Sequence, residues 1–255
     1  MLAVIIPAYN EEDTIGQVLD NLKSLPVKWI IPVLNGCSDA TLPIVLHHTL
    51  IKKVALIHYP LPLGIDIPRA VGAECAIQLG AEEIMFVDGD LSGNFTNCLH
   101  QLYQAVHCQQ CQLALTNCYP NIGYRSQTAK LVLRYREQLN RTLGLFQDIG
   151  LATPSHGPHC LSAALLDIIG TDCLSIPPLL LAKTVESGLK VQVAAALNNE
   201  QWHSRQRDNE HNQKIADTII GDCIEARQYF TKQPITRMDK GIYYFGYRQH
   251  QFPNT

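Results

Sequence analysis

The sequence has no long apolar run and no basic stripe. No window approaches the ~20 apolar residues that a helix needs to cross a bilayer, so any membrane contact is expected to be peripheral. The formal net charge is −3, and charged residues form no long runs. A dedicated nucleic-acid-binding protein would show a basic patch, so we expect no nucleic-acid partner. Small molecules are the expected ligands.

The cysteines lack the pattern of a disulfide framework or a structural zinc site. There are nine, an odd number, and no secretory signal pattern stands at the N-terminus. Cys108 and Cys111 form a CxxC, but no second CxxC follows at a metal-binding spacing. We therefore expect free thiols in a reducing, cytoplasmic compartment. The chain has no internal repeat, and its 255 residues, 46% of them hydrophobic, are expected to form one continuous domain.

The most informative stretch that is present is Ile84–Gly93, IMFVDGDLSG. Four strand-forming residues lead into Asp88, Gly89 and Asp90. Two carboxylates at the end of a buried strand can converge on one cation, and the glycine lets a ligand approach the backbone. Hard oxygen ligands of this kind suit Mg²⁺ or Mn²⁺. The same three residues also form ordinary turns, so the rest of the chain decides between the two interpretations.

Strands and helices alternate over the first 95 residues. The expected strands are 2–7, 29–34, 54–58 and 84–87, and the expected helices are 15–22, 41–50 and 67–79. This alternation predicts an α/β fold with a doubly wound, mostly parallel sheet flanked by helices. The loops 8–11, 35–39, 64–69 and 88–90 then share the carboxyl edge of the sheet, where α/β proteins bind ligands.

Two local expectations concern the first two strand–helix units. Pro32 removes a donor from its strand, which predicts a bulge or an edge position. Asn10 is placed to cap the first helix, and Ser38 or Asp39 to cap the second.

Four segments resemble the family 2 glycosyltransferases with a GT-A fold. They are VIIPAYNEEDTIGQVLDNL, VLNGCSDAT, LGIDIPRAVGAECA and FVDGD, in this order and spacing. The resemblance is close over residues 2–95 and looser beyond. It implies a metal-dependent glycosyltransferase that uses a nucleotide-diphosphate sugar and Mg²⁺ or Mn²⁺. Residues 1–95 would form the donor-binding half, and residues 96–255 the acceptor-binding half with its C-terminal polar loop and helix.

The resemblance also assigns roles to residues at the sheet edge. The nucleotide-sugar-binding residues would be Pro7, Ala8, Tyr9, Glu11, Asn35, Gly64, Arg69, Asp88 and Gly89. Asp88 and Asp90 would contact the ribose and the metal. A departing nucleoside diphosphate gains negative charge, which the cation and Arg69 would stabilise as catalytic groups together with Asp90. Arg69 is equally compatible with a solvated helix surface.

Two positions depart from the pattern of that family. Leu34-Asn35 replaces the usual Asp-Asp, so UDP-linked and GDP-linked donors both remain open. Pro68 stands where most members have alanine or a similar residue, which leaves the sugar contacts open.

The second half is expected to bind the acceptor, whose identity the sequence does not give. The helix 124–141 carries Arg125, Lys130, Arg134, Arg136 and Arg141. These residues would bind a phosphorylated acceptor or an anionic membrane surface, or else form a solvated face. In the loop Gly150–Cys160, we expect His156, Gly157 and His159 to contact the acceptor and His156 to assist proton transfer. An ordinary turn with incidental histidines is the alternative.

The sequence provides no acid in the segment Ser175–Leu179, where many inverting members carry their base. This leans towards a retaining reaction, but Asp148 and Asp167 remain candidate bases, so inverting and retaining transfer both stay open. In retaining relatives a histidine after the last strand completes the metal shell. His203 matches that position best and His211 second, unless the segment is a solvated connector.

Two other functions remain open at this stage. One is a sugar nucleotidyltransferase, although its glycine-rich basic N-terminal signature is replaced here by the acidic PAYNEE. The other is a family member that binds nucleotide without turnover. A homodimer is also considered.

Overall fold

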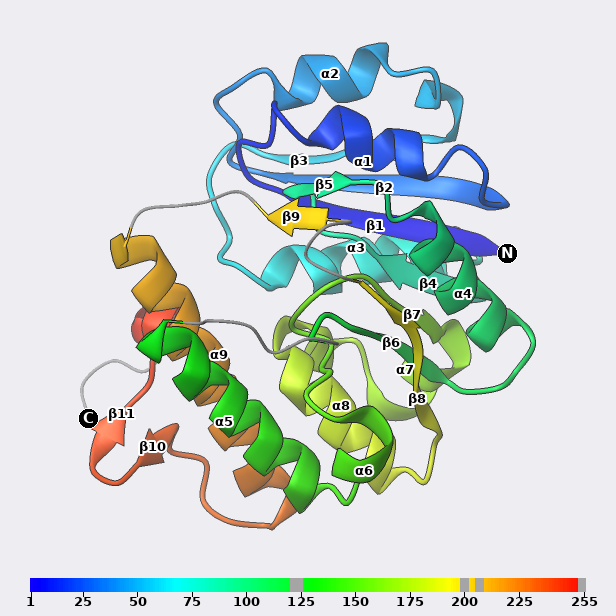
Figure 1. Cartoon of the computed structure of the whole chain (residues 1–255). Helices are drawn as coiled ribbons and strands as arrows, with labels where there is room; N and C mark the ends of the chain where they lie inside the picture. Colours follow the sequence, from blue (N-terminus) through cyan, green and yellow to red (C-terminus); the bar gives the residue numbers. More distant parts are fainter. Residues whose placement is uncertain (120–125, 198–201, 205–208, 252–255) are drawn as a thin grey trace.

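A seven-stranded sheet lies at the centre of the computed structural model, which describes residues 1–119, 126–197, 202–204 and 209–251 (Figure 1). The strand order is β3-β2-β1-β4-β7-β6-β8. The strands are β1 Leu2–Ala8, β2 Val27–Asn35, β3 Ile57–Tyr59, β4 Glu83–Phe86, β6 Leu113–Asn117, β7 His159–Ser162 and β8 Val191–Ala196. Of these, β7 runs antiparallel to both of its neighbours. The expected doubly wound, mostly parallel sheet is therefore confirmed.

Helices cover both faces of the sheet. They are α1 Ile15–Asn21, α2 Thr41–His47, α3 Ile67–Gln78, α4 Thr96–His107, α5 Gln127–Thr142, α6 Phe146–Ile149, α7 Ala163–Ile169, α8 Pro177–Glu186 and α9 Asn209–Phe230. Alternate residues of a strand point to opposite faces. Ala3 and Ile5 of β1 accordingly share a core with α3, α5, α7, α8 and α9, whereas Val4 and Ile6 share one with α1, α2 and α4.

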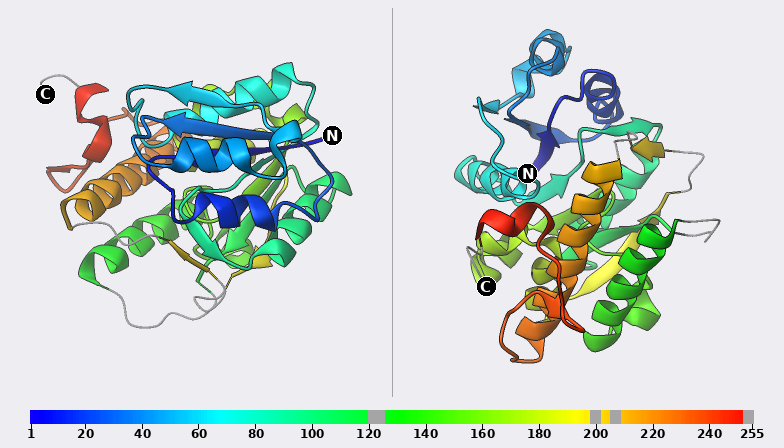
Figure 2. Two further views of the ribbon diagram at one scale, coloured as in Figure 1. Left: turned by 90° about the horizontal axis from the view of Figure 1, so that it is seen from above. Right: turned by 90° about the vertical axis from the view of Figure 1, so that its left-hand side faces the viewer.

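Short elements complete the fold. β5 Leu91–Gly93 pairs antiparallel with β9 Trp202–Ser204, and β10 Met238–Asp239 pairs with β11 Ile242–Tyr243. The 3₁₀ turns are η1 Ile51–Lys53, η2 Asp172–Ser175 and η3 Gly246–Gln251. The turn η3 packs beside α9 near the C-terminus (Figure 2). Within the described ranges, none of the helices combines the length and apolar character that crossing a membrane requires.

Three local expectations are wrong. Pro32 lies inside β2, paired in register with Ile6, and β2 is flanked by β1 and β3 rather than forming an edge. The Ile30 carbonyl accepts from the Ala55 amide on the side of β3, so the nitrogen of Pro32, two residues further on, faces the same side. The ladder between β2 and β3 itself begins one residue later, at Val33. Asn10 does not cap α1, because its Oδ1 accepts from the Ser38 amide at 2.8 Å.

The third correction concerns the loop expected at 150–160. Its last two residues, His159 and Cys160, belong to the buried strand β7. They pair with Phe86 and Met85 of β4. The histidine is therefore part of the sheet and not of a surface turn.

The packing of α3 on the sheet makes a test of the fold. A Cβ on Gly72 would lie 2.4 Å from Ile5 Cγ2, whereas one on Gly16 of α1 would make an ordinary contact of 3.6 Å. We expect Gly72→Ala to lower the free energy of unfolding by about 1–2 kcal/mol, since overpacking outweighs the gain in helix propensity. Gly16→Ala should raise it by up to ~1 kcal/mol. Urea denaturation measures both, and equal effects of the two variants would contradict this packing.

Candidate functional site

The loops after β1 and β2 are tied together at the carboxyl edge of the sheet. The Glu11 amide donates to Thr41 Oγ1 at 2.8 Å, and the Glu12 amide donates to Asp39 Oδ2 at 3.1 Å. In return, Glu12 Oε2 accepts from the Ala40 amide at 2.9 Å. These bonds join the two loops, in which Glu11 is buried, at 3% exposed, and Tyr9 is exposed, at 41%.

The Asp-Gly-Asp turn lies directly against the end of β1. The Gly89 amide donates to the Pro7 carbonyl at 3.0 Å, and Thr14 Oγ1 donates to the Gly89 carbonyl at 2.7 Å. A Cβ at position 89 would lie 2.9 Å from the Pro7 carbonyl oxygen and 3.1 Å from Ala8 Cβ. Glycine is therefore required for this close approach. The sequence-predicted residues 7, 8, 88, 89 and 90 thus meet at one point.

Asn35 holds the loop that follows β3. Its Nδ2 donates to the Gly64 carbonyl at 2.8 Å, and its Oδ1 accepts from the Leu63 amide at 2.7 Å. Gly64 has a φ of +119°, a conformation that L side chains rarely adopt. Asn35 therefore shapes the loop that leads to α3, and its polar atoms bond to that loop.

Arg69 joins the loop after β3 to the Asp-Gly-Asp turn. Its Nη1 donates to Asp66 Oδ1 and its Nη2 to Asp88 Oδ1, both at 2.5 Å. Burial opposes the charged form of Arg69, but Asp88, Asp66 and Asp90 outweigh it and raise the pKa of the guanidinium. Arg69 is 7% exposed, so it is not the solvated helix residue that the sequence left open.

The carboxylates at the tip of β4, those of Asp88 and Asp90, are oxygen ligands of the kind that Mg²⁺ and Mn²⁺ prefer. The side chain of Asp88 is 27% exposed, and Asp90 is partly buried beside it. In the part of the chain that the structure describes, no three His, Cys, Asp or Glu side chains group so as to hold a metal ion. Two carboxylates nevertheless suit a cation whose remaining positions are filled by phosphate oxygens and water.

The two histidines considered as metal ligands lie in different settings. The side chain of His203 lies outside the described residues, but its backbone in β9 pairs with Ser92, two residues beyond Asp90. His211 lies in the first turn of α9, where its Nδ1 is 2.5 Å from Tyr247 Oη.

His156 lies in a stack of side chains beside the segment that follows β6. Its ring packs on Tyr119, with centroids 5.2 Å apart. Tyr119 Oη accepts from Arg136 Nη1 at 2.5 Å, and the Arg136 guanidinium lies 5.6 Å from the Tyr119 ring centroid. Gly157 has a φ of +78°, and a Cβ there would lie 2.5 Å from Cys118 Sγ. The loop before β7 is thereby fitted closely to the end of β6.

His159 does not share this setting. It is 3% exposed, and its ring stacks on Phe86 at 4.8 Å. Burial, and then the charge of Arg69, lower the pKa of His159 to about 3, so the imidazole is neutral near pH 7. A buried, neutral ring inside the sheet is poorly placed to contact an acceptor substrate.

The candidate bases lie away from the turn. Because β7 is antiparallel, the following helix α7 and Asp167 lie at the opposite edge of the sheet from Asp88. Asp148 is exposed on the short helix α6. In Figure 1 this helix lies at the bottom of the molecule, whereas β5 and β9 lie in its upper part. Of the basic residues of α5, Lys130, Arg134 and Arg141 are exposed, whereas Arg136 is 1% exposed and points inward. Arg125 lies outside the described residues.

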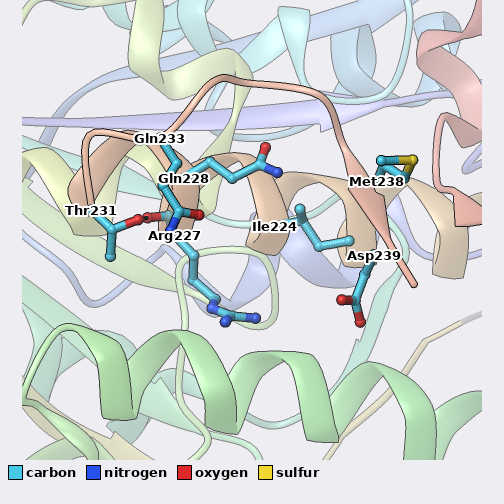
Figure 3. A pocket seen from close by; sticks show the side chains of 7 residues that line it. All are labelled: Ile224, Arg227, Gln228, Thr231, Gln233, Met238 and Asp239. Carbon is cyan, nitrogen blue, oxygen red and sulfur yellow. Dashed lines mark hydrogen bonds between the residues drawn. The ribbon is translucent and has the colours of Figure 1, made fainter. Parts of the chain in front are cut away.

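A separate polar cavity of about 170 Å³ lies at the C-terminal end of α9 (Figure 3). Its lining residues are Ile224, Arg227, Gln228, Thr231, Gln233, Met238 and Asp239. A 22-residue helix is about 33 Å long, so this cavity is remote from the loops that precede α9. Its charged groups bond to α5, since Arg227 donates to Gln138 and Asp239 accepts from Tyr135.

Three polar residues of the sheet edge were not singled out from the sequence. Asp66 stands three residues before Arg69, a spacing that places the two on one face of a helix and could have indicated the pair. Thr14 and Thr41 carry no comparable signal, because each bonds to a loop that is distant in sequence.

Asn35 provides a test of the loop geometry. Asn35→Asp keeps the acceptor for the Leu63 amide and loses the donor to Gly64, whereas Asn35→Ala loses both. We expect amide exchange at Leu63 to become about tenfold faster or more in the alanine variant, because its hydrogen bond is lost. Protection should persist in the aspartate variant. Hydrogen exchange measures this, and equal exchange in the two variants would refute the assigned bond.

Comparisons with known proteins bear on the family and on the fold. A family model described as glycosyl transferase family 2 matches residues 3–160. No curated protein matches the sequence.

Solved structures of glucosyl-3-phosphoglycerate synthase from Mycobacterium tuberculosis resemble the fold. The complex with Mn²⁺, uridine diphosphate and glucosyl-3-phosphoglycerate has a TM-score of 0.67 at 19% identity, over 95% of this chain and 82% of that chain. The complex with Mn²⁺, UDP-glucose and phosphoglyceric acid has a TM-score of 0.68 at 18% identity and the same coverage. At such identities the likeness establishes the fold alone.

Proposed function

Because the chain belongs to the family 2 glycosyltransferases and has the GT-A fold, we propose that it transfers a sugar from a nucleoside-diphosphate sugar to an acceptor. The bond between the anomeric carbon and the diphosphate oxygen breaks, and a bond to an acceptor oxygen forms. The products are the glycosylated acceptor, the nucleoside diphosphate and a proton. The family match over residues 3–160 disfavours a sugar nucleotidyltransferase.

One observation carries this proposal: the Asp-Gly-Asp turn meets the end of β1. The Gly89 amide bonds to the Pro7 carbonyl, so the carboxylates of Asp88 and Asp90 stand beside the loop that begins at Tyr9. The loops after β1 and β2, joined by hydrogen bonds, would contact the base and the ribose. We assign residues 1–95 to the donor and residues 96–255 to the acceptor.

Asp90 and Asp88 would hold a divalent cation, with His203 as the third protein ligand. When bound, Mg²⁺ or Mn²⁺ supplies Lewis-acid stabilisation of the diphosphate. Arg69 holds one oxygen of Asp88 and so fixes the direction in which the carboxylate faces. UDP is the nucleotide to test first, because solved structures of similar fold contain it.

The acceptor side favours an anionic acceptor. Arg136 is 1% exposed, and among the described residues no carboxylate pairs with it. Its buried Nε also has no partner in that part of the chain. An unpaired buried charge is costly, so an anion is its natural partner. We propose that an acceptor phosphate or carboxylate binds near Arg136 and His156, and we assign no contact to His159.

The metal site is tested by thermal unfolding with nucleotides. UDP with Mn²⁺ should stabilise the protein by about 2.7 kcal/mol at 100 times its Kd, and UDP without metal should give much less. Asp90→Ala should abolish the part of the stabilisation that depends on Mn²⁺, because it removes a ligand of the cation. Asp167→Ala, at the opposite edge of the sheet, is the matched control. An unchanged shift in Asp90→Ala would count against the assigned ligand.

The anion site is tested with 3-phosphoglycerate as probe, added to the complex with UDP and Mn²⁺. Arg136→Met keeps the apolar stem and removes the charge, so the probe should bind about 10- to 100-fold more weakly. UDP affinity should be unchanged. Arg134→Met, exposed on the same helix, is the control. Titration calorimetry measures both ligands, and unaltered probe binding in Arg136→Met would exclude this role.

A further inference from the structure

A line of alternating charges connects the C-terminal turn η3 to the Asp-Gly-Asp turn. Arg248 of η3 donates from Nε to Asp222 Oδ1 of α9 at 2.9 Å, and its Nη2 lies 4.0 Å from Asp66 Oδ2. Asp66 accepts from Arg69, which in turn donates to Asp88. The order of charges is therefore Asp222, Arg248, Asp66, Arg69 and Asp88.

The line is buried and anchored to the protein at its far end. The side chains of Arg248, Asp66 and Arg69 are each 9–10% exposed, and that of Asp222 is 2% exposed. Arg248 also donates to the Ser175 carbonyl. Asp222 accepts from Arg237 at 2.7 Å, so the C-terminal segment is held by a second arginine. Removing Arg248 would therefore leave Asp222 paired.

Asp66 and Asp88 share the two ends of one guanidinium. Each carboxylate limits how strongly Arg69 neutralises the other, because the positive charge is divided between them. Without an ionised Asp66, the charge of Arg69 would act only on Asp88, to which it donates, and on nearby Asp90, and it would reduce the negative charge that these two carboxylates offer to a cation. The charge of Arg248, whose Nη2 lies 4.0 Å from Asp66 Oδ2, favours the ionised form of Asp66.

We propose that Asp66 and Arg248 are positioning residues for the donor site, which divide the charge of Arg69 so that Asp88 and Asp90 remain available to a nucleoside diphosphate and its cation. The inference rests on the proposed function. It extends the donor site to the C-terminal turn, which lies in the half assigned to the acceptor.

The protonation of Asp66 reports on this arrangement. The groups that face Asp66 are Arg69 of α3, Asp222 of α9, Arg248 of η3 and Asp88 after β4. Burial, opposed first by Arg69, raises the pKa of Asp66 to about 6. The carboxyl therefore ionises as the pH rises through about 6, and donor binding should fall below that pH. Loss of Arg248 removes a positive charge near Asp66. The fall in donor binding at low pH should then begin at a higher pH.

The same shift predicts the effect of Asp66 on stability. A carboxyl whose pKa is raised in the folded state stabilises the fold below its unfolded pKa, and this contribution is lost as the pH rises through the folded pKa. At pH 7 the ionised Asp66 therefore does not favour folding. Asp66→Asn, which removes the charge and keeps the shape, should unfold at the same temperature as the wild type or higher.

The test measures the Kd of UDP with Mn²⁺ by calorimetry from pH 5.5 to 8.5. The variants are Asp66→Asn, Arg248→Gln and Arg248→Lys, and the control is Lys232→Gln, which removes an exposed partner of Glu186. Comparing variant with wild type at each pH cancels the titration of the nucleotide itself. Residues that orient metal ligands typically contribute 10- to 100-fold in affinity, so Asp66→Asn should bind about tenfold more weakly or worse.

The expected pattern distinguishes positioning from simple structural support. Asp66→Asn should bind UDP with Mn²⁺ more weakly at every pH, and its affinity should no longer change near pH 6. Arg248→Gln should lose affinity at pH 7 and regain it at higher pH, and Arg248→Lys should lie between it and the wild type. The inference would be overturned if Asp66→Asn and Arg248→Gln bound UDP with Mn²⁺ as tightly as the wild type and with the same dependence on pH. A wild-type protein that binds no UDP with Mn²⁺ would instead overturn the proposed function.

Discussion

The contact between Gly89 and the end of β1 fixes the geometry of the whole sheet edge. Its amide bonds to the Pro7 carbonyl at 3.0 Å, and no space remains for a Cβ. Because β1 and β4 are neighbouring parallel strands, the two carboxylates that flank Gly89 stand beside the loop after β1. The polar loops after the other parallel strands gather at the same edge, and they are cross-linked to one another by side-chain bonds.

Charge at this edge is balanced by arginines that come from distant parts of the chain. Arg69 stands between Asp66 and Asp88, and Arg248 reaches Asp66 from the C-terminal turn. Arg136 differs, since its described partners are the hydroxyl and ring of Tyr119. Arg69 and Arg248 are thus neutralised within the protein, whereas no carboxylate among the described residues pairs with Arg136. This division separates the proposed donor side from the proposed acceptor side.

The sheet and the meeting of its loops could be predicted from the sequence. Short apolar runs alternating with amphipathic segments allow few arrangements other than a parallel sheet, whose loops then share an edge. Strand β7 was missed because it has four residues and directly follows Gly157 and Pro158, so it shows no periodicity of its own. The cap assigned to Asn10 was wrong because the Ser38 amide binds its side chain instead.

The contacts within the site were less predictable than its position. The bond of Glu11 to Thr41 and the approach of Arg248 to Asp66 join residues far apart in the sequence, and local spacing carries no trace of them. Arg136 was grouped with exposed basic residues of its helix, although it lies beside the buried Tyr135 and Leu139. Which side of a helix is covered depends on the elements packed against it.

The central claim is that carboxylates at the tip of β4 hold a cation that binds a nucleoside diphosphate. A crystal structure with UDP and Mn²⁺, with anomalous diffraction data for manganese, tests it most directly. The account predicts one manganese peak at a coordination distance of about 2.0–2.3 Å from an Asp90 carboxylate oxygen, with uridine against the loop after β1. Manganese bound elsewhere, or uridine away from that loop, would contradict it.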